Sequence, residues 1–203
     1  MKIGVLSLQG AVAEHIHMIE KAGGDGIVVK RTDQLPDIDG IIIPGGESTT
    51  IGKLMRTYGF IDALREFSLQ GKPLFGTCAG LIVLAKEISG QEEAHLGLMD
   101  IRVARNAFGR QRESFEADLD IKGVDKDVRA VFIRAPLIEQ VGSGVDVLAT
   151  YRDQIVAARQ GHLLAASFHP ELTDDERLHA YFWTWYVNRG RRDLLVGCKT
   201  APQ

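Results

Sequence analysis

The residues best suited to chemistry are a cysteine in a glycine-rich turn and the strand and helix that flank it. Cys78 is the centre of the pentapeptide Gly-Thr-Cys-Ala-Gly at 76–80, between an apolar run that ends at Phe75 and a helical pattern that begins near Leu81. This small-x-nucleophile-x-small spacing is typical of a nucleophile elbow, because glycines let the backbone turn tightly beside neighbouring strands. The following helix directs its positive end at the sulfur and favours the thiolate. We therefore predict that Cys78 is a nucleophile.

A cysteine nucleophile needs a general base and a site for the oxyanion. Of the six histidines, His169 directly follows a predicted buried strand over 163–168, and Glu171 comes two positions later. In the order Cys, His, Glu, the carboxylate can hold the imidazole in its working tautomer. Gly45 and Gly46 follow another apolar strand, over 40–43, and can offer backbone N–H groups to an oxyanion. A lone cysteine is usually a core residue, and a lone Gly-Gly is usually a loop. Here, however, the Cys78 turn, the Gly45–Gly46 pair and the His169–Glu171 segment each follow a predicted strand.

The elements that must position these residues alternate between strands and helices. Strands are expected over 3–8, 27–29, 40–43, up to 75 and over 163–168. Helices are expected over 11–22, over 51–58 after a start at 48–50, over 61–68, from near 81, and from a Thr173 cap to near Gly190. Short alternating runs over 99–104, 115–121, 128–133, 145–151 and 154–158 predict antiparallel strands at a sheet edge. The fold class is therefore α/β, a three-layer, mostly parallel mixed sheet with helices on both faces and an antiparallel edge extension.

The composition indicates one globular domain. The chain has 203 residues, of which 45% are hydrophobic and 25% charged, and a formal net charge of -3. This charge gives no reason to expect nucleic acid or an anionic membrane as a partner. Two cysteines make no disulfide framework, and neither a signal peptide nor an apolar stretch of membrane-spanning length is evident, so a cytoplasmic setting is expected. A single domain is predicted over 1–190, followed by a loosely ordered tail over 191–203.

Several blocks of the sequence resemble the triad (class I) glutamine amidotransferases, and among these the glutaminase subunits of pyridoxal 5'-phosphate synthase. The elbow at 76–80, His-Pro-Glu at 169–171 and Ile-Pro-Gly-Gly at 43–46 match the wider family. The narrower resemblance rests on longer blocks, at 4–10, 44–50, 105–111, 113–115 and 132–136, and runs over residues 1 to about 188.

The resemblance implies hydrolysis of L-glutamine to glutamate and ammonia through a glutamyl thioester, without a cofactor or metal. Cys78 would be the nucleophile, His169 the base and Glu171 its orienting partner. The ammonia would pass to a pyridoxal 5'-phosphate synthase subunit. The residues implied in the remaining roles are Gly46, Glu47, Ser48, Arg105, Ile133 and Arg134 for substrate binding, Gly45, Gly46 and Ala79 for the oxyanion, and Gln9 and Gly10 for contact with the partner.

Three other interpretations stay open at this point. Another class I glutaminase, such as the one that serves imidazole glycerol phosphate synthase, shares the chemistry but not the blocks at 113–115 and 133–136. A cysteine hydrolase or peptidase on a similar sheet would not need the loop at 44–50. A binding protein that has kept the fold without the chemistry would not need an intact Cys78, His169 and Glu171.

Overall fold

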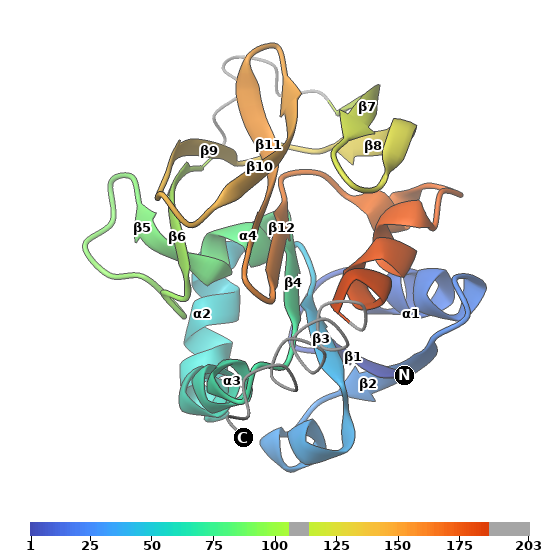
Figure 1. The fold of residues 1–203 in the computed structure, drawn as a ribbon. Coiled ribbons are helices and arrows are strands. Elements are labelled where there is room, and N and C mark those ends of the chain that lie inside the picture. Colours follow the sequence, from blue (N-terminus) through green and yellow to red (C-terminus); the bar gives the residue numbers. More distant parts are fainter. Residues whose placement is uncertain (106–113, 187–203) are drawn as a thin grey trace, which may run out of the picture.

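The structure, a computed structural model, describes residues 1–105 and 114–186 (Figure 1). Its strands are β1 (Lys2–Leu6), β2 (Asp25–Val29), β3 (Gly40–Ile43), β4 (Leu74–Thr77), β5 (Ala85–Ile88), β6 (Met99–Ala104), β7 (Phe115–Ile121), β8 (Asp125–Phe132), β9 (Leu137–Val141), β10 (Asp146–Tyr151), β11 (Gln154–Gln160) and β12 (Leu163–Ala166). Its helices are α1 (Val12–Lys21), η1 (Thr32–Asp37), α2 (Ser48–Thr57), α3 (Phe60–Leu69), α4 (Ala79–Leu84) and η2 (Pro170–Leu172), and a further helical segment covers 177–186.

Within the described residues one large mixed sheet runs in the order β2-β1-β3-β4-β12-β11-β9-β6-β5, with β10 paired to β11. The strands from β2 to β12 along this order are parallel to one another. β11 then pairs antiparallel with β12, and β9 antiparallel with β11 and β6. β7 and β8 form a separate antiparallel ribbon. In parallel α/β sheets ligands bind at the carboxyl ends of the strands, which places a site after β1, β3, β4 and β12.

Helices cover both faces of the sheet, so a core lies on each side. α1 and the helix over 177–186 lie on one face, while α2, α3 and α4 lie on the other (Figure 1). Because strand side chains alternate between faces, Ile41 and Ile43 of β3 pack into the core under α2 and α3, and Ile42 packs into the core with α1. All three side chains are fully buried, as expected for an interior parallel strand.

Three details of the predicted secondary structure are wrong. The helix after the elbow ends at Leu84, and Ala85–Ile88, where no strand was predicted, is β5, because these residues pair with β6. β9, at Leu137–Val141, was not predicted. The last helix begins at 177 and not directly after Thr173, whose hydroxyl instead donates to the carbonyl of Pro170 and accepts from the N–H of Asp175.

The predicted end of the last helix near Gly190 and the predicted tail over 191–203 lie outside the described residues. In the part of the chain that is described, no helix is long and apolar enough to cross a membrane.

Candidate active site

The turn around Cys78 has the backbone of a nucleophile elbow. β4 runs to Thr77 and α4 begins at Ala79, so Cys78 alone joins strand to helix, with φ 49° and ψ −110°. A positive φ is unusual for a residue with a side chain and is held here by surrounding structure, including a 2.8 Å hydrogen bond from the Cys78 N–H to the carbonyl of Ala166 on β12. A Cβ on Gly80 would lie 2.0 Å from the carbonyl oxygen of Ile43, so the close approach of helix to strand requires glycine there.

His169 and Glu171 follow β12 and lie beside this turn. The imidazole Nδ1 of His169 is 2.8 Å from Oε1 of Glu171, and the His169 backbone N–H donates to the carbonyl of Val131 on β8 at 2.8 Å. Glu171 is only 4% exposed. The structure therefore brings together, at one edge of the sheet, the three residues predicted as a triad from positions up to 93 apart in the chain.

Charge and hydrogen bonding set the protonation of this pair. Burial by itself lowers the pKa of His169, but hydrogen bonds with Cys78 and Glu171, together with their charges, raise it to about 10. Burial raises the pKa of Glu171, but the neighbouring His15 and His169 more than offset this and lower it below its ordinary value. The site thus favours an imidazolium between a sulfur and an ionised carboxylate, which is the state that activates a cysteine.

Gly45 fits closely between Cys78 and His169. A Cβ on this residue would lie 2.6 Å from Cε1 of His169 and 3.1 Å from the Cβ of Cys78. Gly46 has φ +147°, and a Cβ there would lie 2.6 Å from the side-chain oxygen of Gln9. These two glycines let the backbone after β3 approach the reacting groups closely, which an oxyanion site built from peptide N–H groups requires.

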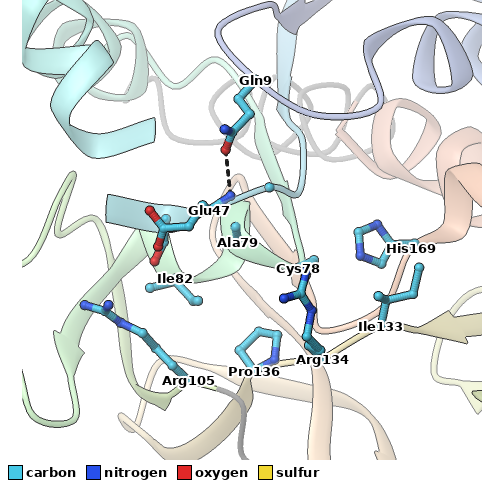
Figure 2. Close-up of a pocket in the computed structure, with 12 residues that line it drawn as sticks. Gln9, Glu47, Cys78, Ala79, Ile82, Arg105, Ile133, Arg134, Pro136 and His169 are labelled. Atoms are coloured by element: carbon cyan, nitrogen blue, oxygen red, sulfur yellow. Dashed lines mark hydrogen bonds between the residues drawn. The ribbon is translucent and has the colours of Figure 1, made fainter. Parts of the chain in front are cut away.

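A pocket of about 450 Å³ opens beside Cys78 and His169 (Figure 2). Its walls come from the ends of β1, β3, β4 and β12 and from the segments that follow β6 and β8. The lining residues are Gln9, Gly46, Glu47, Ser48, Cys78, Ala79, Ile82, Arg105, Ile133, Arg134, Pro136 and His169. All six residues expected to bind substrate are among them.

Glu47 occupies the wall at the start of α2. Its carboxylate accepts hydrogen bonds from the backbone N–H groups of Thr49 and Thr50, so it also caps this helix. The hydrogen bond from the Thr49 side chain is the largest of the effects that lower the pKa of Glu47, to about 2. Its own backbone N–H donates to Oε1 of Gln9 at 2.6 Å, which ties the end of β1 to the loop after β3 (Figure 2).

Two arginines reach the pocket from separate strands. Arg105 follows β6, is partly buried and hydrogen bonds to the side-chain oxygen of Gln91. Arg134 follows β8, is exposed and has φ 45°. Figure 2 shows Arg105 opposite Glu47 and Arg134 nearer to Cys78. The pocket therefore combines a carboxylate and two guanidinium groups around a sulfur.

Some predicted residues lie outside the pocket wall. Gly10 has φ +100°, and a Cβ there would lie 2.1 Å from the carbonyl oxygen of Gly45, so it packs against the loop that follows β3. Gly45 and Glu171 are likewise not among the residues that line the pocket. Cys198 and residues 106–113, which include most of the block that begins at Arg105, lie outside the described residues.

Sequence reasoning missed one group of buried residues beside the site. His15 of α1 lies with its Nε2 3.5 Å from Oε2 of Glu171 and 3.2 Å from Oγ1 of Thr77. The sequence favours His169 over the other five histidines, His15 among them, because His169 directly follows a predicted strand and has a carboxylate two positions later. The position of His15 on the buried face of α1, four residues before Ile19 and three before Met18, was the available signal.

The pocket offers no evident metal centre. Nowhere in residues 1–105 and 114–186 do three or more His, Cys, Asp or Glu side chains gather in a way that could hold a metal ion.

The fold is that of the glutamine amidotransferases. A crystal structure of a glutamine amidotransferase superposes with a TM-score of 0.85 at 51% identity, covering 89% of this chain and 96% of that chain. The structure of PurLQS from Thermotoga maritima shares the fold with a TM-score of 0.70 at 16% identity, covering 91% and 98%. The predicted fold class is confirmed.

The chain belongs to the SNO glutamine amidotransferase family, whose model matches residues 5–188. Among its relatives is the pyridoxal 5'-phosphate synthase subunit PdxT of Niallia circulans, 76% identical over 182 residues, which are 90% of this chain and 96% of the relative. The subunit of the same name from Anoxybacillus flavithermus is 65% identical over 182 residues, 90% of this chain and 95% of the relative. The predicted family is confirmed.

Proposed function

We propose that this chain is the glutaminase subunit of a pyridoxal 5'-phosphate synthase and that the pocket beside Cys78 is its active site. It hydrolyses L-glutamine to glutamate and ammonia and delivers the ammonia to a synthase subunit. The observation that carries the proposal is the strained Cys78 turn beside the 2.8 Å His169–Glu171 pair. The family, and relatives that are 76% and 65% identical, support the same conclusion.

The reaction proceeds in two halves. The Cys78 sulfur attacks the side-chain amide carbon of glutamine, and the carbonyl oxygen becomes an oxyanion that the N–H groups of Gly45, Gly46 and Ala79 stabilise. His169, which has taken the thiol proton, gives it to the leaving nitrogen, so ammonia departs and a glutamyl thioester remains. Water then attacks the thioester with His169 as base, and glutamate leaves as the thiol is restored. Glu171 holds the imidazole throughout.

The charges in the pocket match an amino acid. Glutamine carries a carboxylate and an ammonium, and both must be satisfied when it leaves water. Arg105 or Arg134 can pair with the carboxylate, and Glu47 can attract the ammonium. Gly46, Ser48 and Ile133 complete the contacts. About 450 Å³ is ample for one glutamine.

The identity of the partner is inferred from the relatives, which are named as subunits of a pyridoxal 5'-phosphate synthase. We place its contact at the end of β1, where Gln9 and Gly10 lie. Gln9 touches both Gly46 and the N–H of Glu47, so a protein bound here has a direct route to the oxyanion loop. The Gly45–Gly46 peptide can rotate at little steric cost, and docking would set it so that an N–H faces the oxyanion. The reaction takes place in the cytoplasm.

The test is glutamate formation from L-glutamine, measured with and without a pyridoxal 5'-phosphate synthase subunit, together with the size of the complex. Cys78→Ala should lower the rate by at least about a thousandfold, since the nucleophile is lost. Cys198→Ala is the matched control and should keep the parent rate. A Cys78→Ala protein as active as the parent would contradict the proposed chemistry. Equal parent rates with and without the synthase subunit would contradict control by the partner.

A further inference from the structure

A buried polar cluster adjoins Glu171 and lines no part of the pocket. It consists of His15 on α1, Thr77 at the end of β4 and His179 in the helix over 177–186, and all three residues are 0% exposed. α1 and that helix lie side by side on the same face of the sheet (Figure 1). Buried polar side chains are expensive unless they are hydrogen bonded, so a fully buried pair of histidines calls for a specific role.

The distances connect this cluster to the reacting groups. Nε2 of His15 is 3.2 Å from Oγ1 of Thr77 and 3.5 Å from Oε2 of Glu171. Nδ1 of His15 is 3.0 Å from Nε2 of His179. Oε1 of Glu171 holds His169, whereas Oε2 is buried and has no hydrogen bond to any described residue. The His15 ring is thus next to the free oxygen of Glu171 and to the residue that precedes Cys78.

The charge of Glu171 decides which nitrogen of His15 carries a proton. Burial lowers the pKa of His15 and of His179, so both rings are neutral and each has one N–H. If Nδ1 of His15 donated to His179, the lone pair of its Nε2 would face the carboxylate. If His179 donates instead, His15 presents an N–H to Glu171. The second arrangement is electrostatically favourable, because an N–H rather than a lone pair faces the carboxylate. It makes Nδ1 of His179 an acceptor, and this nitrogen has no hydrogen-bond partner among the described residues.

We infer that His15 is a positioning residue for the glutaminase reaction, whose Nε2–H holds the second oxygen of Glu171 while His179 fixes its tautomer. The inference deepens the proposed function and depends on it. A carboxylate fixed through one oxygen can still rotate about its last bond, whereas one fixed through both keeps His169 aligned with Cys78. Because the same nitrogen lies beside Thr77, His15 also links the orienting carboxylate to the nucleophile turn.

Substitution of His15 separates this role from simple packing. His15→Leu should lower kcat/KM about tenfold to a hundredfold, mainly in kcat, because His15 does not line the pocket. His15→Gln places an amide N–H near the former Nε2 and should stay within about threefold of the parent, because it restores the hydrogen bond. His17→Leu, at an exposed position on the same helix, is the matched control and should not change the rate.

The assay is glutamate formation in complex with a pyridoxal 5'-phosphate synthase subunit, at several pH values, with melting temperatures measured in parallel. Nitrogen-15 NMR of the histidine rings gives a second readout that needs no activity, and should show His15 as the neutral Nε2–H tautomer. A parent that forms no glutamate would refute the proposed function but leave the tautomer test in force.

Three results would overturn the inference itself. The first is a His15→Leu protein that has the same kcat as an active parent. The second is an equal loss in His15→Leu and His15→Gln that follows their melting temperatures, which would make the role structural. The third is an Nδ1–H or a charged His15 ring in the NMR spectrum.

Discussion

Replacing Gly45 by alanine adds one methyl group between the proposed nucleophile and the proposed base. Gly45 is buried and is not among the glycines with positive φ, so alanine can adopt its backbone conformation. The obstacle is space alone, because the new Cβ would lie 2.6 Å from Cε1 of His169 and 3.1 Å from the Cβ of Cys78. The substitution therefore tests the close fit of this loop between the two residues, through the position of the His169 ring and of the Gly45–Gly46 peptide.

The size of the effect follows from that overlap. Ordinary contact begins at 3.4 Å, so the imidazole must retreat by about 0.8 Å from its present 2.6 Å. His169 cannot shift freely, because its Nδ1 is held by Glu171 and its backbone N–H by Val131, each at 2.8 Å. A misplacement of about 1 Å between reacting groups costs about a hundredfold in rate, which corresponds to roughly 2.7 kcal/mol in the barrier.

The assay is the initial rate of glutamate formation in the presence of the synthase subunit, with circular dichroism and melting temperature to verify the fold. Gly144→Ala is the matched control, since its Cβ would find as nearest neighbour the side-chain nitrogen of Gln160 at 3.6 Å. We expect about a hundredfold loss for Gly45→Ala and no change for Gly144→Ala. A folded Gly45→Ala protein within about threefold of the parent would refute the reasoning.

The raised pKa of His169, about 10 against an ordinary 6.5, should make stability depend on pH. Because the folded protein holds this proton more tightly than the unfolded chain, the stabilisation is complete below pH 6.5 and is lost as the pH rises to about 10. The free energy of unfolding, measured by urea titration, should be higher in the parent than in His169→Asn at low pH, and this difference should shrink as the pH rises over the same range. A difference between the two proteins that does not change with pH would contradict the prediction. Glu47→Ala removes the side chain that caps α2 through Thr49 and Thr50, and it should lower the free energy of unfolding by about 1 kcal/mol. The control Glu20→Ala, at an exposed position of α1, should change this free energy little. Equal changes for the two variants in urea titrations would disprove the capping role.

Secondary structure was predictable where the pattern is local. The alternating run over 99–104 became β6 and that over 115–121 became β7, with the predicted bounds. Leu137–Val141 was missed because its two buried residues are adjacent and do not alternate, so its strand conformation depends on pairing with β6 and β11. Residues 85–88 were not predicted as a strand for the same reason, since only the partner strand β6 identifies them as β5.

Residue type and spacing by themselves predicted the fold class and indicated Cys78, His169 and Glu171 as a candidate triad, and the family followed from the resemblance of longer sequence blocks. A tight strand-to-helix turn needs small residues at fixed positions around its centre, so the elbow is encoded within five residues. Only the tertiary structure decided what lies beside these groups. His15 and Glu171 are 156 positions apart, and Gln9 and Glu47 are 38 apart. No local pattern specifies such contacts, because they depend on how α1, the sheet and the segment after β12 pack together.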